Sequence, residues 1–282
     1  MSTDSTATVH APSDVLLHEL DDVGVLTLTF NRPDRNNGWT IELEEAYFGS
    51  LVAAANDPAV RVIVVTGAGR SFCPGLDMLA LEESARLGKP MSTARRFPMT
   101  TARLIPKPVI GAINGAAAGI GFIQMACCDV RFASTTAKFT TAFARRGLPA
   151  ENSLSWLLPK IVGHANAMDL LLSARVIGAE EAHQLGLVNR TTEPGELLAT
   201  AQGYARDVAI NCSPFAVASI KQQTNADWEK SAEEARLTAL VLVSEHGAHA
   251  DFVEGVASFQ EKRPPRFAGY DAGLTIPRGW YR

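Results

Sequence analysis

The chain has 282 residues, of which 46% are hydrophobic and 20% charged, and its formal net charge is −4. These values are typical of a globular protein with one large domain, or with a core and an appended region. The weakly acidic balance gives no basic footprint for nucleic acid, and no apolar run approaches the ~18 residues of a membrane span. We therefore expect neither a nucleic-acid partner nor a membrane-spanning segment.

Residues 1–14 are polar and rich in Ser and Thr, without the basic and apolar regions of a signal peptide. This composition is typical of a disordered leader. Beyond it we expect a core over residues 15–195, a helical region over 196–265 and a tail over 266–282. The four cysteines lack metal-finger spacing, which favours reduced thiols and a cytoplasmic location.

The first half of the chain alternates strands with helices. Apolar and β-branched runs between turn residues predict strands over residues 23–30, 60–66, 108–113, 129–133 and 138–143. Helical periodicity predicts helices over residues 40–56 and 119–127. An irregular insert, residues 86–103, carries basic side chains that could steer an anionic ligand, namely Lys89, Arg95, Arg96 and Arg103.

Helices predominate in the second half. They are expected over residues 153–162, 165–173, 179–185, 195–210, 214–227, 231–248 and 251–260, with one strand over 187–190. A strand-rich first half followed by a helix-rich second half indicates an α/β fold with a helical C-terminal region.

Two strand–turn–helix units contain glycine-rich turns. The segment from Gly67 to Asp77 follows the strand at residues 60–66, and Asn114-Gly115 follows the strand at 108–113. A turn before a helix start leaves backbone N–H groups without partners. Two such groups could converge on one oxygen and stabilise an oxyanion. The alternative is that both are ordinary tight turns.

Several motifs occur in a characteristic order and together resemble the crotonase (enoyl-CoA hydratase/isomerase) superfamily over roughly residues 15–265. They lie at residues 31–33, 71–77, 112–119, 128–129, 147–149, 161–163, 182–188 and 259–263. The resemblance implies a spiral of ββα units and C-terminal helices that build homotrimers, or hexamers from two trimers. It also implies an acyl-CoA thioester substrate and stabilisation of its enolate, with no cofactor because coenzyme A is part of the substrate.

The resemblance further implies that the backbone N–H groups of Leu76 and Ile120 are the two oxyanion donors. Ile120 stands where relatives often have the middle glycine of three, so its side chain should narrow the pocket. Asp77, beside the first donor, is expected to order the turn, and Cys73 is expected to be structural. The two positions that carry glutamates in a double-carboxylate hydratase hold Ile123 and Phe143 here, and neither side chain can transfer a proton.

An acidic residue stands at a third position of the family pattern, four residues after Gly147. This residue is Glu151, and single-base Δ3,Δ2-enoyl-CoA isomerases resemble the chain there. An apolar pocket of Ile123, Phe143 and Trp156 is expected to raise the pKa of this carboxyl. The alternative is a carboxylate at the N-terminus of the next helix, beside a capping Asn152 or Ser153.

By the same resemblance, coenzyme A would bind near Arg35 and Ala68, and Phe259 and Lys262 would reach it from a neighbouring subunit. A guanidinium matches phosphate oxygens well, although each of these side chains could also be an ordinary surface or core residue. His246 and His249 have helical spacing but no third ligand nearby, so no metal is expected.

Three functions follow in order of preference. The first is an enoyl-CoA isomerase that shifts a Δ3 double bond to Δ2 with Glu151 as its single acid/base. The second is an enoyl-CoA hydratase with an atypical active site, and the third is a non-catalytic acyl-CoA-binding protein. An RNA-binding role would need a basic face, and the pI of about 5.9 argues against it.

Overall fold

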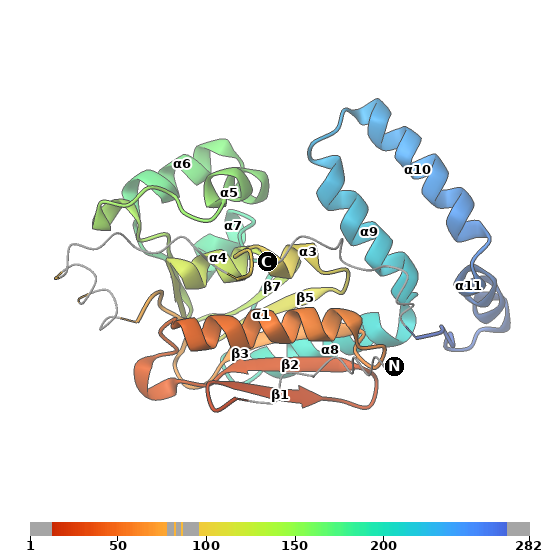
Figure 1. The fold of residues 1–282 in the computed structure, drawn as a ribbon, viewed down its shortest axis with the longest axis horizontal. Helices are drawn as coiled ribbons and strands as arrows, with labels where there is room; N and C mark the ends of the chain where they lie inside the picture. Colours follow the sequence, from red (N-terminus) through yellow and green to blue (C-terminus); the bar gives the residue numbers. More distant parts are fainter. Residues whose placement is uncertain (1–12, 78–81, 83–85, 87–95, 270–282) are drawn as a thin grey trace, which may run out of the picture.

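The fold is described from a computed structural model that covers residues 13–77, 82, 86 and 96–269 (Figure 1). Most of the expected leader, the end of the expected tail, and Lys89 and Arg95 of the insert lie outside the described residues. Within the described part, no helix combines the length and apolar character needed to cross a bilayer.

The larger sheet has six strands in the order β1-β2-β3-β5-β7-β10. Their bounds are Leu16–Leu20, Val25–Phe30, Val62–Gly67, Val109–Ile113, Val130–Ser134 and Arg190–Thr192. The first two strands pair antiparallel and all other neighbours pair parallel. The hairpin strand β1 was not predicted from the sequence.

The smaller sheet has four short strands in the order β4-β6-β8-β9. Their bounds are Ser71–Cys73, Ala116–Ala118, Lys138–Thr140 and Ile177–Gly178. Each of β3, β5 and β7 in the larger sheet is followed by a strand of the smaller one, β4, β6 and β8 respectively. The chain therefore winds as a spiral of ββα units, and the predicted α/β fold class is confirmed.

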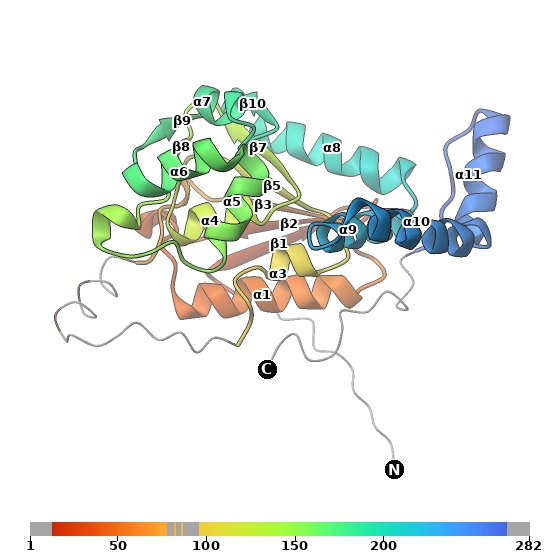
Figure 2. The same cartoon turned by 90° about the horizontal axis from the view of Figure 1, so that it is seen from above.

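The inner strands β2, β3 and β5 of the larger sheet are buried on both faces, between helices on either side (Figure 2). Helix α1, Ile41–Asn56, covers one face, and its Thr40 side chain accepts a hydrogen bond from the Leu43 N–H as an N-cap. Helix α8, Leu197–Asn211, covers the other face. Side chains alternate along a strand, so Val64 of β3 packs in the cluster that includes α8, whereas Val65 packs in the main core.

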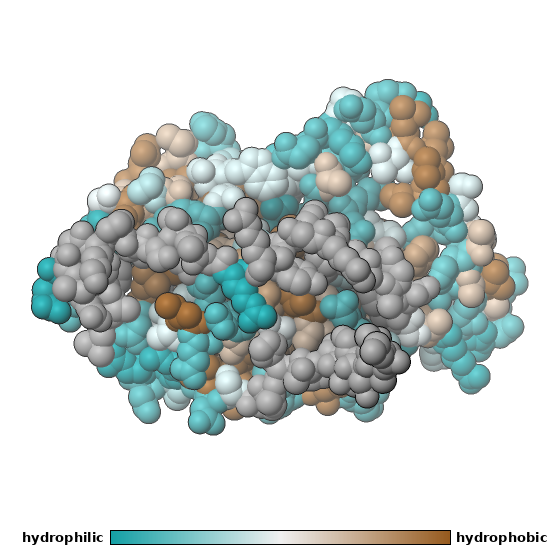
Figure 3. Space-filling model, viewed as in Figure 1, coloured by the Kyte–Doolittle hydropathy of each residue, from teal (hydrophilic) through white to brown (hydrophobic). Residues whose placement is uncertain are grey.

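The remaining helices form two groups: shorter helices on the core, and three helices that extend away from it (Figure 1). The first group is α3, Thr101–Leu104; α4, Ile120–Ala126; α5, Leu154–Val162; α6, His164–Ser173; and α7, Ala179–Gln184. The second group is α9, Pro214–Asp227; α10, Ala232–Gly247; and α11, Ala250–Glu261. Helix α10 has no buried residue, and apolar side chains gather on α10 and α11 at the surface (Figure 3).

Candidate active site

The two glycine-rich turns contact each other between β4 and the start of α4. Gly75 has a φ of 109°, and a Cβ on it would lie 3.2 Å from the carbonyl oxygen of Ala118. Gly119, with a φ of 52°, lies directly before α4. Positive φ values of this kind favour glycine. The tertiary fold thus brings together two turns that are more than forty residues apart in the sequence.

Each turn presents one backbone N–H group without a partner in the described part of the chain, at Leu76 and at Ile120. The Trp39 N–H donates to the Gly75 carbonyl at 2.7 Å, and the Asp77 N–H donates to the Trp39 carbonyl at 3.0 Å. These two hydrogen bonds form a parallel β-bridge between Trp39 and Leu76. The bridge uses the Gly75 carbonyl and the Asp77 N–H, so the N–H of Leu76 itself points away from Trp39. Ile120 is the first residue of α4, where an N–H has no intrahelical acceptor.

A cavity of about 200 Å³ is lined by Leu76 and Ile120, the two residues that carry these N–H groups. The described residues that line it are Pro74, Gly75, Leu76, Gly119, Ile120, Ala142, Phe143, Arg146, Leu148 and Glu151. All are apolar side chains or glycines except Arg146 and Glu151. The structure therefore brings Leu76, Ile120, Phe143 and Glu151 to one cavity, and their roles stay predictions.

Two of the residues expected in the acyl pocket do not line this cavity. Ile123 is fully buried in the main core. Trp156 is 36% exposed and packs edge-on against Trp228, with ring centroids 5.2 Å apart. The Arg103 guanidinium lies 4.9 Å from the Trp156 ring, so this tryptophan belongs to a cation–π cluster on the helices.

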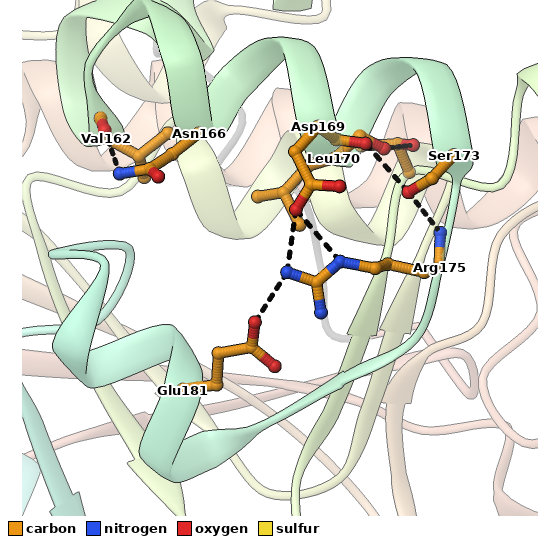
Figure 4. Close-up of polar contacts among 8 residues, drawn as sticks. Val162, Asn166, Asp169, Leu170, Ser173, Arg175 and Glu181 are labelled. Atoms are coloured by element: carbon orange, nitrogen blue, oxygen red, sulfur yellow. Dashed lines mark hydrogen bonds and ion pairs between the residues drawn. The ribbon is translucent and has the colours of Figure 1, made fainter.

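The loop that carries Phe143 is held by α6. The buried Thr141 hydroxyl donates to the Leu170 carbonyl at 2.8 Å. At the end of α6, Arg175 bridges Asp169 at 2.7 Å and Glu181 of α7 at 2.5 Å (Figure 4). Thr141 thus ties the loop to α6, and Arg175 links the end of α6 to α7.

Glu151 precedes α5 rather than lying within it. Its carbonyl accepts the Leu154 N–H at 2.9 Å, and Asn152 and Ser153 both have left-handed φ values, 49° and 65°. Ser153 stands at the N-cap of α5, but its side chain accepts no hydrogen bond from the helix. The left-handed pair turns the chain sharply after Glu151, and Glu151 is one of the residues that line the cavity.

Arg35 and Ala68 lie beside the first glycine-rich turn. Asp77 is nearly buried and accepts hydrogen bonds from Arg35 at 2.8 Å and from Arg32 at 3.1 Å. The hydrogen bond and charge of Asp77 raise the pKa of Arg35. The Asn37 amide donates to the Ala68 carbonyl at 2.9 Å. One network therefore fixes the turn and both predicted coenzyme A contacts.

The predicted contacts Phe259 and Lys262 lie far along the chain on α11 and its C-cap. Phe259 is 85% exposed and lines a different cavity, of about 560 Å³, together with His249. His249 stacks on Phe215 at 4.1 Å between centroids. The role of Phe259 and Lys262 in coenzyme A binding stays a prediction. Among the described residues, no group of three or more His, Cys, Asp or Glu side chains could hold a metal ion.

A larger cavity, of about 610 Å³, lies beside α9 and away from Glu151. Its lining includes Lys221, which pairs with Asp129 at 2.7 Å and also donates to the Ala102 and Lys107 carbonyls. Lys221 and Asp129 already have partners, whereas the Leu76 and Ile120 N–H groups have none among the described residues. The smaller cavity is therefore the better candidate for chemistry.

A sequence profile described as "Enoyl-CoA hydratase/isomerase" matches residues 21–270. The chain belongs to the enoyl-CoA hydratase/isomerase family. It is 38% identical over 255 residues to a 1,2-epoxyphenylacetyl-CoA isomerase of Escherichia coli K12, covering 87% of this chain and 95% of that relative. It is 32% identical over 284 residues to a probable enoyl-CoA hydratase of Mycobacterium leprae, covering 93% and 94%.

Solved structures of the family share this fold. A putative enoyl-CoA hydratase/isomerase of Mycobacterium abscessus has a TM-score of 0.85 at 29% identity, covering 90% of this chain and 100% of that one. A putative enoyl-CoA hydratase of Streptomyces coelicolor has a TM-score of 0.84 at 31% identity, covering 96% and 100%. The family members matched here thus carry both isomerase and hydratase names.

Proposed function

We propose that this protein is an enoyl-CoA isomerase that moves a Δ3 double bond to Δ2, with Glu151 as its single acid/base. The observation that carries the proposal is the shared cavity, in which Glu151 is the one carboxylate among the described lining residues and faces the same space as Leu76 and Ile120. Family membership supports an acyl-CoA thioester as the substrate.

The thioester carbonyl would accept hydrogen bonds from the Leu76 and Ile120 N–H groups. Glu151 would take a proton from C2, and the negative charge would pass to the thioester oxygen as a dienolate. Preorganised donors aimed at this oxygen are worth ~3 kcal/mol each in a transition state. The same carboxyl would return the proton to C4, so that the C3–C4 double bond becomes a C2–C3 double bond with no net gain or loss of atoms or electrons.

The residues at the two hydratase positions support isomerisation over hydration. Ile123 is buried in the core, and Phe143 lines the cavity as an apolar wall. Neither can position or deprotonate a water. An atypical hydratase is the second candidate, because several relatives carry that name. It would have to use Glu151 alone to activate the water.

We also propose that coenzyme A binds near Arg35 and Ala68 and that the protein is a homotrimer or a hexamer of two trimers. The exposed apolar surface of α10 and α11 supports the assembly (Figure 3), since a single chain leaves it uncovered. In such an assembly Phe259 and Lys262 of one copy would approach the coenzyme A of another.

The test is to incubate the purified protein in D2O with trans-3-hexenoyl-CoA and, separately, with trans-2-hexenoyl-CoA, and to identify products by mass spectrometry. Conversion of the 3-enoyl to the 2-enoyl ester, lost in Glu151→Gln and retained in the exposed Glu180→Gln control, is the expected result. Hydration of the 2-enoyl ester that depends on Glu151 would replace the isomerase with the hydratase. Binding of both esters without turnover would indicate a non-catalytic acyl-CoA-binding protein. The epoxide named for the E. coli relative is a further substrate to include.

A further inference from the structure

The candidate cavity is lined by an exposed cationic side chain that no sequence motif marked as functional. Arg146 lines it together with Glu151, and these are its only two charged side chains among the described lining residues. The remaining wall is apolar or glycine. An arginine beside an acyl cavity has no role in shifting a double bond, so its presence needs a separate explanation.

The backbone of Arg146 is fixed, whereas its guanidinium is not. Arg146 ends the short 3₁₀ helix Ala144–Arg146, and its N–H donates to the Phe143 carbonyl at 2.8 Å. The side chain makes one long contact within the described residues, from Nη1 to the Ala142 carbonyl at 3.4 Å. No carboxylate in the described part of the chain lies within ion-pair distance of it. Most of its N–H donors are therefore available to a ligand.

The neighbouring arginine provides a contrast on the same turn. The Arg145 Nε donates to the Ser173 carbonyl of α6 at 3.0 Å, and Arg145 is not part of the cavity lining. The 3₁₀ turn thus directs one arginine toward α6 and the next toward the cavity.

We propose that Arg146 selects acyl-CoA substrates whose acyl group ends in a carboxylate. This inference rests on the proposed function, because it assigns a substrate class to the same cavity. An arginine fork matches a carboxylate with two parallel hydrogen bonds. The volume of about 200 Å³ accommodates roughly seven heavy atoms at ~30 Å³ each. A six-carbon dicarboxylic acyl group has about seven heavy atoms from C2 to the terminal carboxylate, which are five carbons and two oxygens, so it fits the cavity.

The test measures binding apart from turnover, by calorimetry with two unreactive saturated esters, hexanedioyl-CoA and hexanoyl-CoA. The wild-type protein should bind the dicarboxylic ester at least about tenfold more tightly, as expected for a charge-assisted hydrogen-bonded pair. Arg146→Leu should remove this preference, Arg146→Lys should retain part of it, and Arg145→Leu should leave it unchanged. In parallel, kcat/KM for trans-3-hexenedioyl-CoA should fall at least about tenfold in Arg146→Leu relative to trans-3-hexenoyl-CoA.

Other outcomes separate the two proposals. If Arg146→Leu weakens the binding of both esters equally, Arg146 contacts the coenzyme A moiety and the selectivity proposal is wrong. A wild-type protein without preference for the dicarboxylic ester would also overturn it, even if isomerase activity is present. A clear preference without isomerisation would support the role of Arg146 and contradict the proposed reaction.

Discussion

Gly121 lies against the carbonyl group of Cys73, so closely that a Cβ on residue 121 would stand 1.9 Å from the Cys73 oxygen. This approach holds the start of α4 against β4 and sets the position of the Ile120 N–H relative to that of Leu76. The distance between the two proposed oxyanion donors therefore depends on residue 121 being glycine, because any side chain there would push α4 away from β4.

Gly121→Ala should accordingly damage both the fold and the site. Relieving the overlap requires the α4 backbone to move, so we expect a loss of at least about 3 kcal/mol in the free energy of unfolding, with a fall in kcat. Urea denaturation measures the first effect. The control is Gly203→Ala in α8, where no described atom outside the adjacent helix backbone lies within 4 Å of the added methyl and a gain of ~0.5–1 kcal/mol is expected. Unchanged stability of Gly121→Ala would show that the two turns separate easily.

Asp77→Asn should loosen the first turn. The carboxylate is 8% exposed and pairs with both Arg32 and Arg35, so the amide would leave two guanidinium groups with weaker acceptors. We expect a loss of about 1–3 kcal/mol in unfolding free energy and a lower kcat, because the Leu76 N–H is adjacent. Asp169→Asn, which breaks an exposed pair with Arg175, should cost under ~1 kcal/mol. Equal effects of the two substitutions would contradict a structural role for Asp77.

The cysteines should differ sharply in reactivity. Burial raises the pKa of Cys73, Cys127 and Cys128 to about 12, so at pH 8 only ~10⁻⁴ of each is the reactive thiolate. Cys212 is only partly buried, and burial raises its pKa less far. A thiol-reactive dye should label one cysteine quickly in the native protein and four after denaturation, and Cys212→Ser should abolish the fast reaction. Rapid native labelling of Cys73 would show that the turn around it opens.

Charged substitutions on α10 should disrupt the proposed assembly. Leu240 is 57% exposed and Val243 69% exposed, so the double substitution Leu240→Glu/Val243→Glu should not disturb a single folded chain. Light scattering after gel filtration should detect a trimer or hexamer for the wild type and a smaller species for the variant. Ile41→Glu, at a residue 77% exposed on α1, serves as the control and should not change the mass. A monomeric wild type would disprove the assembly.

Hydrophobic periodicity in the sequence predicted most strands of the larger sheet and the C-terminal helices. Long amphipathic or fully apolar segments can be recognised from the sequence because their pattern repeats over several turns or residue pairs. The strands β1 and β9 escaped prediction, β4 was predicted to be part of a turn, and β6 was predicted to be the start of a helix. Three of these four have two or three residues, too few to display alternation.

The sequence alone determined the family, the order of the two glycine-rich turns, and the presence of an acid at position 151 with apolar residues at the two hydratase positions. Only the tertiary structure decided which of these groups share a cavity. It placed Glu151 and Phe143 in the lining of the cavity that Leu76 and Ile120 also line, put Ile123 in the core, and directed Trp156 toward Trp228. It also added Arg146 to the cavity wall and paired Asp77 with Arg32, 45 residues away. Local patterns report the period of an element, whereas the direction of one side chain depends on packing between elements that are distant in the chain.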